Sequence, residues 1–130
     1  VAVTADPAER DRLTARAGFI VTATTSSEPV LADNVRDGAF VAAVGSFTPQ
    51  AAELPPSLVG RASLFVDDFA SAKVEAGDYL RAGVDWGRVT PLEDVLDGAP
   101  PRPAGPIVFK SVGHALFDLA AARLAFILRS

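Results

Sequence analysis

Cysteine is absent from the 130-residue sequence, and histidine, tryptophan and tyrosine each occur only once. Without cysteine the chain has no disulfide framework and no thiolate metal site, and one histidine does not supply a histidine-rich zinc site. We therefore expect no metal centre of either kind. Any chemistry must come from carboxylates, hydroxyls, lysine, the single histidine or a bound cofactor.

A strong charge of one sign and a long apolar run are also missing. Twelve Lys and Arg residues stand against sixteen Asp and Glu residues, for a net charge of -4, with no basic cluster of the kind that binds nucleic acid. No apolar run reaches the roughly 18 residues of a membrane span. The lack of cysteine agrees with a reducing compartment, and we expect a cytoplasmic protein.

The length and the hydrophobic fraction of 49% predict a single domain with its own core. Two short apolar runs stand out because both end abruptly in small and hydroxyl-bearing residues. Residues 19–23 are followed by a polar loop at 24–29, and residues 39–44 by another at 45–49. Such runs are typical of inner strands in a parallel sheet, where ligands lie beyond the carboxyl ends. The sequence therefore predicts a ligand crevice between these two loops.

The rest of the chain alternates strands and helices with short connections, which favours an α/β fold with a parallel sheet. Asp6 and Pro7 are typical of a helix start, and Gly18 of the chain just beyond a helix end. Helices are predicted at residues 7–17, 71–80 (broken near Gly77) and 92–96, and one helical turn at 56–61. Helical turns are predicted at 31–35 and 50–54, further strands at 1–4, 62–66 and 107–109, a loop around Trp86, and an extended proline-rich connector at 99–106.

A final helix is predicted after Ser111, whose hydroxyl is a good N-cap. Its apolar residues fall on one helical stripe, which predicts packing against a large surface. The stripe consists of Leu116, Leu119, Ala120, Leu124, Ile127 and Leu128.

Five sequence blocks occur in an order that resembles the ornithine cyclodeaminase/mu-crystallin family. They are IVTATTS at 20–26, AVGSFTP at 43–49 with Glu53-Leu54, VDD at 66–68, EAGD at 75–78 and FKSVG at 109–113. The resemblance covers nearly the whole chain. It implies a Rossmann-like domain that binds NAD or NADP, and a separate domain that binds substrate and forms a homodimer.

The glycine-rich phosphate loop that such a nucleotide fold uses is not found, since no G-x-G-x-x-G occurs in the sequence. We therefore interpret residues 1–130 as the second half of a dinucleotide-binding domain, without the phosphate loop and without the substrate and dimerisation domain. The choice between NAD and NADP depends on the first half of such a domain.

The resemblance implies that the loops after the two apolar runs and before the last helix bind the cofactor. The implied cofactor residues are Ala23, Thr24, Thr25, Ser26, Val44, Gly45, Ser46 and Ser111. The alternative is that these hydroxyls only satisfy backbone groups in turns.

Phe47, Thr48, Val112 and Gly113 are the implied substrate pocket. Phe47 stands where the family's cyclodeaminases carry an aspartate that does acid/base work, so no catalytic residue is assigned. An aromatic wall there suits a flat, apolar ring such as a cyclic imine. The alternative is that Phe47 is a core residue at a strand end.

Other polar residues have simpler interpretations. Asp67 and Asp68 point to opposite faces of a strand and are expected to cap the next helix. Glu53, Glu75 and Asp78 are expected to cap or form salt bridges, Lys110 to pair with an acidic residue at the surface, and His114 to pack or face solvent one turn inside the last helix.

The function that these features predict is NAD(P)H-dependent reduction of a cyclic ketimine, such as Δ1-pyrroline-2-carboxylate, by a larger parent protein. Two alternatives remain open. One is ornithine cyclodeamination, which needs another group in place of the missing aspartate. The other is a mu-crystallin-like protein that binds NADPH and a small ligand without turnover.

Overall fold

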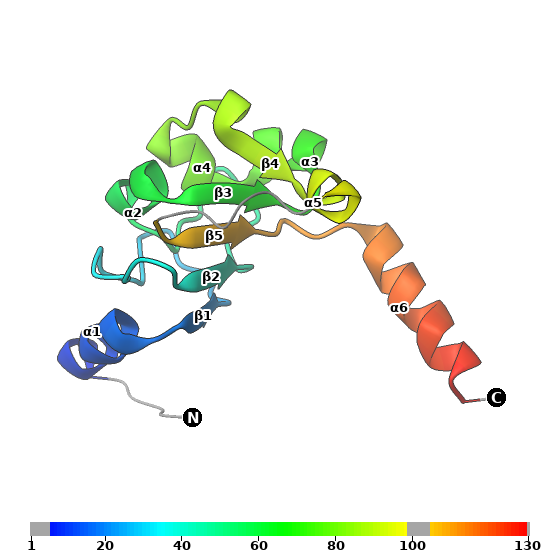
Figure 1. Ribbon diagram of the computed structural model, residues 1–130, viewed down its shortest axis with the longest axis horizontal. Helices are drawn as coiled ribbons and strands as arrows, with labels where there is room; N and C mark the ends of the chain where they lie inside the picture. The colour runs from blue at the N-terminus through cyan, green and yellow to red at the C-terminus, as the bar shows by residue number, and fades with distance from the viewer. Residues whose placement is uncertain (1–5, 99–104, 130) are drawn as a thin grey trace.

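The computed structural model describes residues 6–98 and 105–129, so the strand expected at 1–4 and most of the proline-rich connector lie outside it. Within these residues one parallel sheet has the strand order β1-β2-β5-β3-β4 (Figure 1). The strands are β1 Phe19–Thr22, β2 Phe40–Ala43, β3 Ser63–Val66, β4 Val89–Pro91 and β5 Ile107–Lys110. The predicted α/β fold is confirmed.

The first helix begins as its sequence predicts and ends close to the predicted position. In α1, Pro7–Arg16, the Asp6 carboxylate accepts a 3.0 Å hydrogen bond from the backbone N–H of Ala8, and proline occupies the first turn. The helix ends at Arg16, and Ala17 is its C-cap in an extended conformation. The expected left-handed cap at Gly18 is wrong, because Gly18 does not have a positive φ. The chain then enters β1 directly, so α1 lies beside the edge strand (Figure 1).

The core lies on one face of the sheet, because alternate strand residues point to that face. Val41, Leu64 and Val108 are buried there, together with residues of α2, Pro56–Arg61, and α4, Gly77–Ala82. Tyr79 of α4 is fully buried in this core. Its hydroxyl lies 3.0 Å from the Phe65 carbonyl oxygen and 3.1 Å from that of Val108, so the helix is held to two central strands.

The opposite face of the sheet is apolar but only partly covered. Phe40, Phe65 and Phe109 on this face are half-buried, and Phe19 is 65% exposed. The rings of Phe19 and Phe40 stack with centroids 5.2 Å apart, because the two residues are register partners on β1 and β2.

The predicted helical turns at 31–35 and 50–54 are wrong. The backbone N–H groups of Val30 and Leu31 donate to the carbonyl oxygen of Glu53 rather than to a helical partner. Those of Glu53 and Leu54 donate to the Asp78 carboxylate, at 2.6 and 2.9 Å. These long-range partners replace the local bonds that a helical turn needs.

The helix predicted at 71–80 is divided, as expected, into α3, Phe69–Glu75, and α4. Ala76 separates them, and the break brings Gly77 against the backbone of another segment. A Cβ at Gly77 would lie 2.0 Å from the carbonyl oxygen of Ala51, a contact that only glycine avoids. The region that follows holds a 3-10 turn at Trp86–Arg88 where a loop was predicted, the unpredicted strand β4, and α5, Leu92–Asp97.

The last helix, α6, spans Ala115–Ile127 and begins later than predicted. Its N-cap is His114, whose ring nitrogen accepts from the N–H of Leu116 at 3.2 Å, and not Ser111. The predicted packing of its apolar stripe does not occur within the described residues: α6 projects from the sheet, and Leu116, Ile127 and Leu128 of the stripe are 62%, 62% and 76% exposed (Figure 1). Among the described residues no helix has the length and apolarity needed to cross a membrane.

Candidate functional site

The three loops implicated by the sequence lie side by side, because they follow three neighbouring strands. Thr22, Ala43 and Lys110 end β1, β2 and β5 at the same level of the sheet. The N–H of Val44 donates to Thr22 at 2.9 Å, and that of Ser111 donates to Ala43 at 3.0 Å, so pairing continues into the loops. We call residues 23–26, 44–48 and 111–113 the loop ledge.

The upper surface of the loop ledge consists of small and apolar side chains. Phe47 is 53% exposed and Val44 is 41% exposed, so the interpretation of Phe47 as a core residue is wrong for the described structure. Exposed residues of the ledge also include Ala23, Thr24, Thr25, Thr48 and Gly113; Ser26, Gly45, Ser111 and Val112 are half-buried, and Ser46 is buried.

A single carboxylate, that of Glu53, lies beneath the first two loops. One oxygen, Oε1, accepts from the Thr24 N–H at 2.6 Å and from its hydroxyl at 3.0 Å. The other, Oε2, accepts from the Gly45 N–H at 2.8 Å and from the Thr22 hydroxyl at 2.9 Å. Burial alone would raise the pKa of Glu53, but these four donors outweigh it and hold the pKa below the ordinary value.

Gly45 is required by the close approach of the two loops. A Cβ at this position would lie 2.1 Å from the backbone oxygen of Thr24, 2.3 Å from its nitrogen and 2.5 Å from Glu53 Oε1. The reason for this glycine is therefore contact between loops, which the sequence alone does not distinguish from contact with a ligand.

Glu53 is supported from behind by a second buried carboxylate. Asp78 Oδ1 accepts from the backbone N–H groups of Glu53 and Leu54, and Asp78 Oδ2 lies 3.6 Å from Lys110 Nζ. Both side chains of this ion pair are fully buried, so the prediction of Lys110 at the surface is wrong. Burial lowers the pKa of Lys110, although the carboxylates of Asp78 and Glu53 act in the opposite direction. Ser46 joins this network, with its hydroxyl 3.3 Å from the Asp78 N–H.

The third loop is held by Asp67. Its Oδ2 accepts from the Ser111 hydroxyl at 2.6 Å, from the Val112 N–H at 3.1 Å and from the Gly113 N–H at 2.9 Å. Ser111 is therefore bound to a carboxylate instead of capping α6. Asp68 is the N-cap of α3, as predicted: it accepts from the N–H of Ser71 at 2.6 Å, and hydrogen bonds with Ser71 lower the pKa of Asp68.

The loop ledge has the chemistry to hold one end of a nicotinamide cofactor. Polar groups of Thr24, Gly45, Ser111, Val112 and Gly113 turn inward onto Glu53 or Asp67, and the twelve residues of the ledge include no charged side chain. A neutral, planar ring matches such a surface, whereas a pyrophosphate needs the helix N-terminus and glycine-rich loop that these residues do not form. The residues that would face the ring belong to the ends of β1, β2 and β5.

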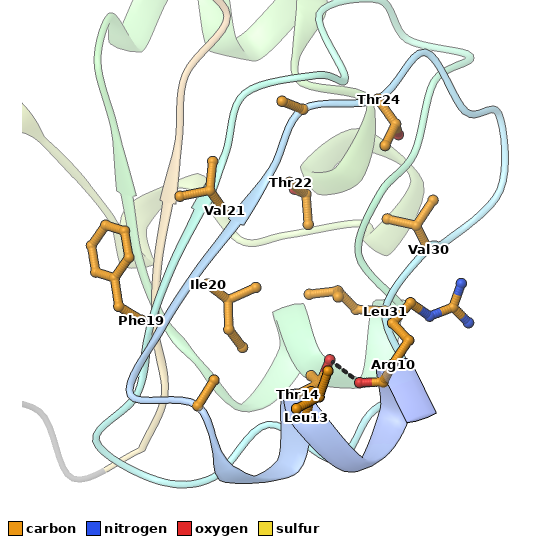
Figure 2. Close-up of a pocket in the computed structure, with 12 residues that line it drawn as sticks. Arg10, Leu13, Thr14, Phe19, Ile20, Val21, Thr22, Thr24, Val30 and Leu31 are labelled. Carbon is orange, nitrogen blue, oxygen red and sulfur yellow. Dashed lines mark hydrogen bonds between the residues drawn. The ribbon is translucent and has the colours of Figure 1, made fainter. Parts of the chain in front are cut away.

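A cleft of about 590 Å³ runs along β1 below the ledge. Figure 2 shows its lining, which comes from α1, β1 and the segment around Val30 and Leu31. Leu13 and Ile20 make the lining mainly apolar, and one end reaches the ledge at Ala23 and Thr24. β2 pairs with one edge of β1. Along the other edge, no strand of the described residues pairs with β1.

The expected pairing of Lys110 with an acidic residue and the expected salt bridge of Asp78 are confirmed, but sequence reasoning missed that this pair is buried, and it missed the roles of Glu53 and Asp67. For Lys110 a signal exists, because it follows Val108 by two residues in β5 and so shares the buried face. Glu53 lies in an irregular segment, Asp67 directly follows β3, and Asp78 lies in the first turn of α4, all far along the chain from their partners. No spacing rule connects them with those partners.

Residues 1–126 match the ornithine cyclodeaminase/mu-crystallin family. A Δ1-pyrroline-2-carboxylate reductase of Burkholderia multivorans is 47% identical over 119 residues, which are 92% of this chain and 38% of that protein. The chain thus spans little more than a third of the length of this curated relative.

Two solved structures share the fold. A Δ1-pyrroline-2-carboxylate reductase of Thermococcus litoralis, in complex with NADH and L-proline, has a TM-score of 0.78 and 28% identity, covering 89% of this chain and 39% of that one. The iminosuccinate reductase of Paracoccus denitrificans, in complex with NAD+, has a TM-score of 0.76 and 34% identity, covering 87% and 37%.

Proposed function

The chain belongs to the ornithine cyclodeaminase/mu-crystallin family, and on that premise we propose that the full-length protein carrying it is an NAD(P)H-dependent ketimine reductase. Its substrate is a cyclic imine with a 2-carboxylate, of the Δ1-pyrroline-2-carboxylate kind, and its product is an L-proline-like amino acid. The similarity to a reductase of this activity at 47% identity supports the choice of substrate class.

The observation that carries the proposal is the exposed, uncharged surface that Phe47 and Val44 form beside Ala23 and Val112 on the loop ledge. An imine ring and a nicotinamide ring are both flat and largely apolar, so both gain from contact with such a surface. Phe47 carries no proton to transfer, which argues against cyclodeamination through an acid/base group at this position.

The cofactor, NADH or NADPH, supplies the hydride that adds to the C=N carbon, and one proton added to the nitrogen completes the amine. The contribution of this chain is to orient the rings and to exclude water. We assign the cofactor contacts to Ala23–Ser26, Val44–Ser46 and Ser111, and the substrate contacts to Phe47, Thr48, Val112 and Gly113.

The same proposal treats the chain as the second half of a dinucleotide-binding domain. Three surfaces of the described residues support this: the edge of β1 that pairs with no described strand, the apolar cleft beside it, and the half-covered sheet face. A further strand or helix would bury each of them. A cytoplasmic homodimer, with its dimer contacts in a separate domain, completes the proposal.

The test is an assay of the full-length protein with NADH and with NADPH, followed at the nicotinamide absorbance, using Δ1-pyrroline-2-carboxylate as substrate. We expect consumption of one of the two cofactors with formation of proline. Conversion of ornithine to proline and ammonia, without imine reduction, would overturn the proposal in favour of a cyclodeaminase. Tight NADPH binding without turnover of either substrate would overturn it in favour of a binding protein.

A further inference from the structure

The Glu53 side chain hydrogen-bonds to two of the three loops of the proposed nicotinamide site. Oε1 accepts hydrogen bonds from the N–H and the hydroxyl of Thr24, in the loop after β1. Oε2 accepts from the N–H of Gly45, in the loop after β2. The residues beside these two, Ala23, Thr25 and Val44, are exposed on the ledge. The position of the carboxylate therefore sets the spacing of the exposed residues.

The main chain of Glu53 is fixed independently of its side chain. Asp78 accepts the N–H groups of Glu53 and Leu54, at 2.6 and 2.9 Å, and the carbonyl oxygen of Glu53 accepts from the N–H groups of Val30 and Leu31. Because the N–H and the carbonyl oxygen of Glu53 are both hydrogen-bonded, the side chain extends toward the loops from a fixed backbone.

The donors around Glu53 require a carboxylate and not an amide. Four donors converge on two oxygens, and two of these donors are backbone N–H groups that have no acceptor form. A glutamine offers one acceptor oxygen, so its NH2 group must face the backbone N–H of either Thr24 or Gly45. One of the two loops then loses its hydrogen bond to residue 53, although glutamine has nearly the same shape as glutamate.

We propose that Glu53 is a positioning residue for the nicotinamide end of the cofactor, acting through Thr24 and Gly45 without touching the cofactor itself. This inference rests on the proposed function, because it takes the loop ledge as the nicotinamide site. It assigns Glu53 a role beyond stability: the carboxylate keeps the two loops in the arrangement that the ring binds.

The experiment compares two ligands on the full-length protein, NADH and ADP-ribose, which lacks the nicotinamide ring; if NADPH is the preferred cofactor, it is compared with 2′-phospho-ADP-ribose in the place of ADP-ribose. For Glu53→Gln we expect the dissociation constant of the dinucleotide to rise about 10-fold or more, as the loss of one charged hydrogen bond implies, and that of ADP-ribose to stay within about twofold. Glu93→Gln is the matched control, because Glu93 is exposed on α5 and is expected to change neither constant.

A purely structural role for Glu53 would weaken both ligands equally, and that result would overturn the inference. An unchanged dinucleotide affinity in Glu53→Gln would overturn it as well. If Glu53→Gln does not fold, Thr22→Val gives the same comparison, because Thr22 is buried and its hydroxyl reaches the site only through Glu53. For this variant we expect a smaller loss of affinity, again confined to the ligand that carries the nicotinamide ring. An equal loss of affinity for both ligands would contradict the inference. Failure of the wild-type protein to bind either dinucleotide would instead overturn the proposed function.

Discussion

The Ser111 hydroxyl donates a 2.6 Å hydrogen bond to the carboxylate of Asp67, and this contact joins the ends of two neighbouring strands, β5 and β3. Glu53 joins the ends of β1 and β2 in the same manner. Two carboxylates, each shared by two strand ends, thus fix the four strand ends that surround the proposed site.

Ser111→Ala is expected to lower the free energy of unfolding by about 1.5–3 kcal/mol, because it removes a short hydrogen bond to a charged group. Ser57→Ala is the control, since Ser57 is exposed on α2 and is expected to change stability by less than about 0.5 kcal/mol. Urea unfolding of the full-length protein measures both. Equal effects of the two substitutions would show that the contact with Asp67 adds nothing.

Gly45→Ala is expected to destabilise the protein by about 1–3 kcal/mol or more, because its Cβ meets backbone atoms of Thr24 that have no free direction to move. Gly60→Ala is the matched control. Gly60 lies inside α2 with nothing within 4 Å of an added Cβ, so alanine there should stabilise by about 0.5–1 kcal/mol. Thermal unfolding should shift in opposite directions for the two variants, and parallel shifts would contradict this account.

Acid should remove the stability that Glu53 contributes. The pKa of Glu53 is lowered in the folded state, so its contribution is complete above the unfolded value of about 4.3 and is lost as the pH falls toward the folded value. In that window the unfolded chain binds the extra proton. The difference in unfolding free energy between wild type and Glu53→Gln should therefore be constant near neutral pH and shrink below about pH 4.3. A difference that grows on acidification would mean that folding raises the pKa of Glu53, and it would contradict this prediction.

Phe47→Ala should separate a substrate contact from a core contact. Because Phe47 is 53% exposed, we expect the unfolding free energy to change by less than about 1 kcal/mol, well below the 3–5 kcal/mol of a buried phenylalanine. The Michaelis constant for the imine should rise while that for the cofactor changes less. A large loss of stability with unchanged kinetics would return Phe47 to the core.

The sequence predicts the strands and their polar ends well, because apolar runs bounded by turn residues have few other interpretations. It misses β4, a three-residue strand that ends in Pro91 and has no alternation to detect. It also places helical turns at 31–35 and 50–54, where local spacing is suitable. There the backbone groups instead bind Glu53 and Asp78, partners that local spacing does not reveal.

The candidate site, like the fold, is predicted from the sequence only in part. Its location follows from topology, because parallel strands bring their carboxyl ends to one edge of the sheet. The hydrogen bonds that hold its loops do not follow from topology, since Glu53 lies 31 residues from Thr22 and Asp67 lies 44 residues from Ser111. Ser111 shows the consequence: a residue that is a good N-cap by type is bound to Asp67 instead, and α6 begins after His114.

The most direct test of the central claim is a crystal structure of the full-length protein with NADH or NADPH bound. We predict that the nicotinamide ring contacts the loop ledge within about 4 Å, among residues 23–26, 44–46 and 111, with the face of Phe47 toward the imine side. A ring bound away from these three loops would contradict the account, however well the protein reduces an imine.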